Sequence, residues 1–197
     1  CSITPSTTNL EIDAVSEKQQ VNCNASGNPD EMEQAYPALL EMKWDREAFG
    51  CGALYAYELA ASSWFGVERK AEALGAQITY LDILSRQYPR LYQSGELAEE
   101  LRKEWFATKF RASELVAQLE KFEWLAAEIP LLHGAYLLTS VEKEANVKEQ
   151  FAVVNPARAL IEQSVKDKPE ALDGLGYLIL GRLSLSLPSF YGGNIQE

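Results

Sequence analysis

The sequence predicts an all-α fold of stacked antiparallel helical hairpins. Apolar residues recur at intervals of three and four along most of the chain, the period of a helix, and no segment reads as a strand. Pro89, Pro130 and Pro169 lie 41 and 39 residues apart. A spacing of about 40 residues fits one helix pair per unit, stacked so that neighbouring units bury each other's apolar faces. A generic helical bundle is the alternative.

Helix breakers divide the chain into eight expected helices. The first starts at Asn28-Pro29-Asp30, where proline fixes φ and the acidic side chain favours the positive end of a helix. The other separators are Gly66, Pro89, Ser94-Gly95, Pro130 and Pro169, with Asn155-Pro156 near a helix start. The expected helices span residues 30–43, 46–64, 68–87, 95–110, 113–127, 131–145, 150–167 and 171–186.

Two stripes with helical spacing are expected to face a core. The clearest is a small-and-apolar series at i, i+3, i+4, i+7 and i+8, formed by Ala157, Leu160, Ile161, Ser164 and Val165. The second consists of Leu97, Leu101, Trp105 and Thr108, continued after Ser113 by Leu115, Leu119, Phe122 and Leu125. The charged residues between these positions predict a solvated face, made of Glu99, Glu100, Arg102, Lys103 and Glu104.

Length and charge limit the classes of protein to which the chain can belong. With 197 residues, 47% of them hydrophobic, it is long enough to bury the core of one globular domain. The formal net charge of -11 and the lack of a Lys/Arg run argue against nucleic acid as a partner. Residues 1–28 are polar and predict a flexible tether, followed by a helical domain over residues 29–197. No stretch is apolar enough to predict a transmembrane helix.

The three cysteines predict a lipid anchor and one candidate disulfide. The chain starts at Cys1-Ser2 rather than Met, which resembles the mature end of a bacterial lipoprotein after removal of its signal peptide. This resemblance implies a lipidated Cys1, with Ser2 favouring the outer membrane and the periplasm; an artificial start is the alternative. Cys23 and Cys51 are either bonded to each other or two buried free thiols.

The sequence predicts no catalytic residue, no cofactor and no metal site. With one histidine and no Cys/His cluster, the chain has too few ligands for a conventional zinc site. Its serines lack a nucleophile elbow, its paired carboxylates lie on faces expected to be solvated, and its glycines lack a phosphate-binding spacing. The simplest interpretation of His133 is a structural residue, in the interior or in a groove, whose imidazole has its hydrogen-bond partners. An all-helical hydrolase would have to use His133.

Aromatic residues are the candidates for a ligand or partner groove. Neighbours on a helix lie about 100° apart, so the pairs Trp64-Phe65 and Trp105-Phe106 cannot both point into one narrow stripe. One of each pair is expected to line a groove or an interface, where buried aromatic anchors carry binding energy. The candidate groove residues are Trp64, Phe65, Trp105, Phe106, His133, Tyr136, Tyr177, Phe190 and Tyr191.

One segment resembles a tetratricopeptide repeat. Its Ala157-x3-Ile161-x2-Ser164-x4-Pro169 has the small, large, small, proline order of the second helix of such a repeat. Upstream, His133-Gly134-x2-Leu137 is loosely similar to the Leu-Gly-x2-Tyr of the first helix. The resemblance implies paired helices that approach closely through small residues.

The last quarter of the chain resembles the T-component of tetratricopeptide-associated TRAP transporters. The residues that carry the resemblance are Gly174-Leu-Gly-Tyr-Leu-Ile-Leu-Gly181 and Leu187-Pro188-Ser-Phe-Tyr-Gly192-Gly193-Asn194. Gly174 and Gly181, seven residues apart, predict one helix face that allows close helix approach. Pro188 is expected to end that helix, Gly192-Gly193 to form a turn, and Asn194 to cap a following helix. The family often has aromatics where Leu132-His133 stands here.

The resemblance implies a non-enzymatic periplasmic lipoprotein that forms a homotrimer of helical repeats with a central channel. It implies association with the solute-binding protein of a TRAP transporter, an apolar or organic-acid ligand, and contact with the membrane through the lipid anchor only. The alternative function is a helical-repeat scaffold lipoprotein for envelope or outer-membrane assembly, which would use the same repeats to hold peptides.

Overall fold

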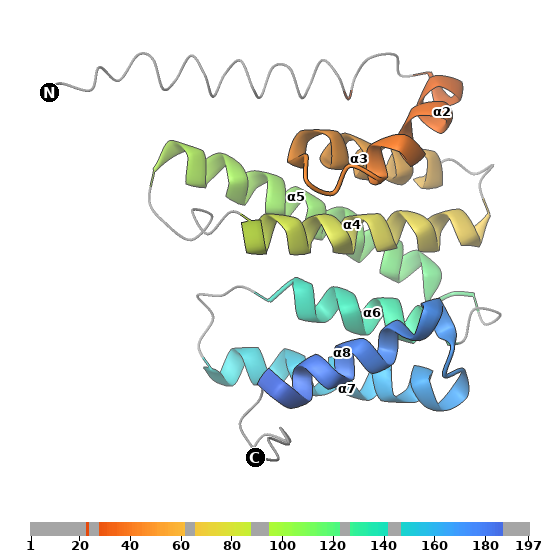
Figure 1. Ribbon diagram of the computed structural model, residues 1–197, viewed down its shortest axis with the longest axis vertical. Coiled ribbons are helices and arrows are strands. Elements are labelled where there is room, and N and C mark those ends of the chain that lie inside the picture. The colour runs from red at the N-terminus through yellow and green to blue at the C-terminus, as the bar shows by residue number, and fades with distance from the viewer. Residues whose placement is uncertain are drawn as a thin grey trace, which may run out of the picture. The chain divides into compact units, whose positions relative to one another are not determined.

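The protein is all-α in every part that a computed structural model describes, namely Cys23 and residues 28–61, 66–87, 95–122, 127–141 and 147–186 (Figure 1). Within these residues no strand occurs, and seven α-helices pack against their neighbours, an arrangement compatible with a helical-repeat fold. The predicted fold class is confirmed. The helices are α2 (Pro29–Leu40), α3 (Arg46–Ala61), α4 (Val67–Gln87), α5 (Glu96–Leu119), α6 (Glu128–Thr139), α7 (Val147–Asp167) and α8 (Leu175–Ser186), with a 3-10 turn, η3 (Ala171–Gly174), before α8.

The chain divides into two compact units, which meet in sequence between Arg111 and Ala112 within α5. In the first unit, α3 packs against both α2 and α4. In the second unit, α7 packs against α6, η3 and α8. Figure 1 shows α4 running back along α3, and α6, α7 and α8 alternating in direction. These are the antiparallel hairpins that the periodicity predicts.

Side-chain caps fix where the first two described helices begin. The Asn28 Oδ1 accepts a hydrogen bond from the Asp30 N–H at 3.1 Å, and Pro29 occupies the first helical turn. The Asp45 Oδ1 accepts from the backbone N–H groups of Glu47 and Ala48 at 3.0 and 3.1 Å. The predicted start of the helical part at Asn28-Pro29 therefore has a physical cause, because Asn28 satisfies the Asp30 N–H, which has no partner within the helix.

The predicted break between residues 110 and 113 is wrong, because α5 runs through it without interruption. The residues at this position, Arg111 and Ala112, are good helix formers, and Ser113 costs a helix only a few tenths of a kcal/mol, about 0.5. No glycine or proline stands there to stop the backbone hydrogen bonds. The separate helix predicted over residues 113–127 is thus the last part of α5, which ends at Leu119.

Two of the prolines do not separate helices as predicted. Pro130 lies in the first turn of α6, where the missing N–H would have no partner in any case. Pro156 lies in the middle of α7, which begins at Val147 rather than near residue 150. Pro169 follows the end of α7 at Asp167, as the sequence predicts. The helix expected over 131–145 ends earlier, at Thr139.

The core of the first unit is built from large side chains of α3, α4 and α5. Phe49 and Tyr80 lie with their ring centroids 6.1 Å apart and are almost completely buried. Leu101 and Trp105 on α5 are 1% and 3% exposed, which confirms the first part of their stripe, but Phe122, expected to continue it, is 37% exposed and that expectation is wrong. Cys51, in the same buried stretch of α3, is joined to Cys23 by a disulfide, so the bonded alternative holds in the structure.

Glycines set the helix spacing in the second unit. A Cβ on Gly134 of α6 would lie 2.6 Å from the Ile161 Cγ1 and 2.8 Å from the Ala157 carbonyl oxygen of α7. A Cβ on Gly176 of α8 would lie 2.4 Å from the Val165 Cγ2. Both distances are below van der Waals contact, so only glycine lets the backbones approach this closely.

The glycine pair expected to make this contact is the wrong one. Gly174 belongs to η3, with φ +75, and Gly181 lies on the exposed side of α8, and neither would bring a Cβ within 4 Å of another group. A separation of seven residues does place two glycines on the same face of a helix, as the sequence predicts. The face of α8 that packs on α7 is the one that contains Gly176, and the sequence pattern alone does not determine which face is buried.

Three consecutive left-handed residues connect α7 to α8. Leu172, Asp173 and Gly174 have φ values of 48, 56 and 75°. This conformation is free for glycine but costs roughly 1 kcal/mol or more for each of the other two residues. The turn reverses the chain within η3 and delivers Leu175 and Ile179 to the core around Leu131 and Ile161.

No helix in the described ranges combines the length and apolarity needed to span a bilayer.

Removing the disulfide is expected to destabilise the first unit. The Cys23→Ala, Cys51→Ala double variant should lose about 3 kcal/mol of unfolding free energy, because the sequence separation of 28 residues no longer closes a loop in the unfolded chain. Urea unfolding with and without a reductant measures this. Reductant should destabilise the wild type to a similar level and leave the double variant unchanged; a double variant as stable as the oxidised wild type would contradict the expectation.

Gly134→Ala is expected to destabilise the second unit by about 1–3 kcal/mol, since one of the two clashing groups is backbone and cannot rotate away. The matched control is Gly75→Ala on α4, where a Cβ meets nothing within 4 Å. That control should stabilise the protein by up to about 1 kcal/mol through helix propensity. Thermal unfolding of both variants tests the pair, and equal melting temperatures would refute the close-approach argument.

Candidate functional site

The predicted groove residues fall in both units, and each unit is described by itself. Trp105 and Phe106 lie on α5 in the first unit, whereas His133 and Tyr136 on α6 and Tyr177 on α8 lie in the second. Several predicted residues lie outside the described part of the chain: Cys1, Trp64, Phe65, Pro188, Phe190, Tyr191, Gly192, Gly193 and Asn194.

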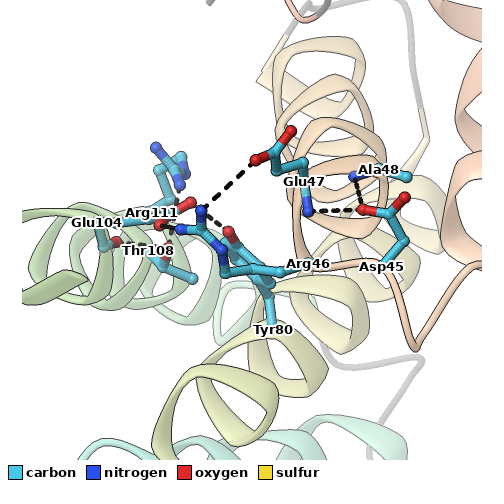
Figure 2. Close-up of polar contacts among 8 residues, drawn as sticks. All are labelled: Asp45, Arg46, Glu47, Ala48, Tyr80, Glu104, Thr108 and Arg111. Atoms are coloured by element: carbon cyan, nitrogen blue, oxygen red, sulfur yellow. Dashed lines mark hydrogen bonds and ion pairs between the residues drawn. The ribbon is translucent and has the colours of Figure 1, made fainter. Parts of the chain in front are cut away.

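A carboxylate on α5 joins three helices of the first unit. The Glu104 Oε2 accepts a hydrogen bond from the Arg46 Nη1 at 2.6 Å, and its Oε1 accepts one from the Tyr80 hydroxyl. Figure 2 shows Arg46 reaching from the start of α3 and Tyr80 from α4 to this one carboxylate. The Arg46 and Glu104 side chains are 14% and 20% exposed, so the ion pair is well shielded from water. The expectation that Glu104 is part of a solvated face is therefore wrong.

A second polar link lies two turns further along α5. The Arg111 guanidinium donates to the Gln77 Oε1 and to the Thr108 Oγ1, both at 3.1 Å. The fully buried Gln77 in turn donates to the Ala53 carbonyl oxygen at 2.6 Å, which ties α4 to α3. Glu104, Thr108 and Arg111 recur at i, i+4 and i+7, so these contacts lie on one face of α5.

Burial shifts two pKa values in this polar cluster. The pKa of Arg111 is lowered, chiefly because the guanidinium is desolvated, with Tyr80 and Glu104 opposing the shift. Desolvation also raises the pKa of Glu58 on α3, and the nearby positive charge of Arg111 opposes it. Arg111 therefore carries a desolvated charge whose two hydrogen-bond acceptors are neutral side chains.

Of the adjacent aromatics on α5, one is buried and the other is not. Trp105 is 3% exposed, whereas Phe106 is 49% exposed, with the two rings edge to face and their centroids 5.2 Å apart. The ammonium of Lys109 lies 4.9 Å from the centroid of the Trp105 ring, and the buried Trp105 Nε1 has no hydrogen-bond partner among the residues that the structure describes. One turn beyond Phe106, Phe110 is 63% exposed, so α5 presents two phenyl rings outward.

The two α6 residues make polar contacts of different kinds. The His133 Nδ1 lies 2.9 Å from a carboxylate oxygen of Glu120, just after α5, and both side chains are partly exposed. Tyr136 is buried, and desolvation raises the pKa of its phenol, while hydrogen bonds with Ser113 and Ser140 oppose the shift. That these two residues line a groove stays a prediction.

An ion pair fastens the start of α6 to the end of α7. The Lys168 Nζ donates to the Glu128 Oε1 at 2.7 Å. This bond lowers the pKa of Glu128 and raises that of Lys168. Glu128 therefore stabilises the fold above its unfolded pKa, and this contribution is lost as the pH falls through the lower folded value.

Large apolar side chains on α8 face outward. Tyr177 is 57% exposed, Leu178 54% and Leu185 72%. Tyr177 therefore lies outside the core, and its place in a groove stays a prediction.

Sequence reasoning missed Arg46, Glu104 and Arg111, the residues that join the helices of the first unit. The i, i+4, i+7 spacing of Glu104, Thr108 and Arg111 was a usable signal, because Thr108 belongs to the stripe predicted to face the core. Their partners Arg46 and Tyr80 are 58 and 24 residues distant, and no local pattern specifies such contacts.

Among the described residues, no group of three or more His, Cys, Asp or Glu side chains is placed to hold a metal ion. Comparison with known proteins found no matching family model, no similar curated protein and no similar solved structure.

The Arg46–Glu104 pair is expected to contribute more than a surface ion pair. A double-mutant cycle with Arg46→Met and Glu104→Gln should give a coupling energy of about 1–2 kcal/mol in urea unfolding. The matched control is Arg86 with Asp82 on α4, whose side chains are 61% and 40% exposed and should couple by less than about 0.5 kcal/mol. Equal coupling energies in the two cycles would refute a special role for Glu104.

Proposed function

We propose that this protein is a non-enzymatic accessory protein of a TRAP-type solute transporter, a periplasmic lipoprotein held at the outer membrane by its N-terminal lipid. In this role it binds the transporter's solute-binding protein. The sequence resemblance to the T-component family is the origin of the proposal, and it extends to an apolar or organic-acid ligand and to assembly as a homo-oligomer.

The observation that carries the proposal is the contact between α6 and α7. The residues that resemble a tetratricopeptide repeat meet there: Gly134 of the first helix lies against Ala157 and Ile161 of the second. Ala157, Ile161 and Ser164 are all fully buried. The small, large, small order is therefore present as helix packing and not only as a spacing, which supports a repeat of this type over a chance pattern.

Exposed apolar side chains support binding to another protein. Phe106 and Phe110 project from α5 in the first unit, and Tyr177 and Leu185 project from α8 in the second. Aromatic side chains on rigid helices are typical anchors of protein interfaces, because they bury large areas at a small cost in conformational entropy.

A catalytic role has less support. Within the described residues, the polar contact of His133 is with Glu120, which can orient an imidazole but is not a nucleophile for a hydrolase triad. Glu58 on α3 has a raised pKa, as many general acids do, but its side chain is only partly shielded from solvent. Neither residue is part of a pair of carboxylates arranged for acid and base roles.

Reconstitution with the transporter's own solute-binding protein tests the proposal. The two proteins, each purified at micromolar concentration, should elute together in size-exclusion chromatography with light scattering. The control is a solute-binding protein from an unrelated transporter of the same periplasm, which should elute separately. A chain that remains a monomer and binds neither protein would overturn the proposal, and specific capture of an outer-membrane assembly factor instead would favour the scaffold alternative.

A further inference from the structure

The outer face of α8 is apolar, although α8 is the last described helix of its unit. Among the twelve residues of α8, Arg182 is the one with a formal charge, and none is acidic. One side of the helix lies in the core through Ile179 and Leu180. The opposite side exposes Tyr177, Leu178 and Leu185 by more than half. An exposed apolar face of this kind is suited to being covered.

A glycine without a neighbour lies in the middle of that face. Both helix contacts of α7 in this unit use glycine, Gly134 toward α6 and Gly176 toward α8. Gly181 follows Gly176 by five residues and therefore lies well round the helix from it, and a Cβ there would meet nothing within 4 Å. Tyr177 and Leu185, one turn before and after Gly181, project on either side of it. The outer face thus has a small-residue notch like those of the two filled contacts, and no described helix lies in it.

Charge distinguishes between the possible occupants. Arg182 lies beside the notch, and its guanidinium makes no hydrogen bond or ion pair with any described residue. If two antiparallel copies of α8 crossed at Gly181, a two-fold axis would place both Arg182 side chains on the same flank, where they would repel each other, and in a parallel pair α8 would still offer no carboxylate to Arg182. Because α8 has no carboxylate to offer a second copy, a helix that carries its own acidic flank fits this face better.

We propose that the outer face of α8 is the docking site for an amphipathic helix of a partner protein. A large apolar side chain of that helix enters the notch at Gly181, and a carboxylate on its flank pairs with Arg182. This inference rests on the proposed function, because it assigns the partner-binding surface and states the chemistry of the segment that binds there. The mode is a helix laid against an apolar helix face, recognised by anchors one turn apart.

The probe is a fluorescein-labelled amphipathic peptide of about 18 residues with a leucine seam and glutamates on its flanks, long enough to form a helix on binding. Its twin has lysines in place of the glutamates. In fluorescence anisotropy with the full chain, the glutamate peptide should bind at least about tenfold more tightly than the lysine twin. Arg182→Glu should reverse this preference.

Gly181→Leu tests the notch without harm to the fold. The substitution fills open space and raises helix propensity, so the melting temperature should be equal to or above that of the wild type. Binding of the glutamate peptide should weaken at least about tenfold. The control is Ala159→Leu, at an exposed position of α7 in the same unit, which should leave binding unchanged.

Three results would overturn the inference: no binding of the glutamate peptide, equal binding of the two peptides, or undiminished binding by Gly181→Leu. Self-association of the free chain that Gly181→Leu abolishes, seen by sedimentation, would also overturn it in favour of a second copy. Failure here is distinct from failure of the proposed function. If the solute-binding protein is captured equally well by the wild type and by Gly181→Leu, only the docking site is refuted. If the peptide binds but the solute-binding protein is not captured, only the proposed function is refuted.

Discussion

Close approach of helix backbones at glycine is the constraint on which the second unit depends. At Gly134 and Gly176 the neighbouring atoms of α7 occupy the space where a Cβ would be, so no other residue fits without moving a helix. Ile161 is the common neighbour, since it faces both glycines and is completely buried. The three helices α6, α7 and α8 are thus packed around one isoleucine, with the polar pair of Glu128 and Lys168 at its margin.

The first unit has one glycine contact of the same kind, since a Cβ on Gly52 of α3 would lie 2.9 Å from the Leu39 Cβ of α2. Among α3, α4 and α5 it adds polar, partly buried contacts that converge on Glu104 and Gln77. A shielded carboxylate that accepts from both Arg46 and Tyr80 offsets its desolvation through charge-assisted hydrogen bonds. Such a network specifies one arrangement of α3, α4 and α5, because any slip of α5 would leave buried polar groups without partners.

The sequence was sufficient for features that depend on neighbours along the chain. Helical periodicity predicts the class of fold, Asn28 and Pro29 predict the first helix start, and the buried stripe through Ile161 follows from its spacing. It was insufficient where distant partners decide: Glu104 looks like a surface residue until Arg46 and Tyr80 are placed beside it. Gly176 was missed for the same reason, since a helix with apolar residues all round does not reveal which side its core occupies.

The left-handed turn before α8 gives the orientation of that helix a physical cause. Leu172 and Asp173 adopt positive φ at a cost of roughly 1 kcal/mol or more each, so the turn persists only if the contacts that it permits offset this strain. Those contacts are the seating of Gly176 against Val165 and of Ile179 and Leu180 in the core. Rotating α8 to bury Tyr177 and Leu185 would forfeit them. The apolar outer face is therefore a consequence of a specified orientation and not of loose packing.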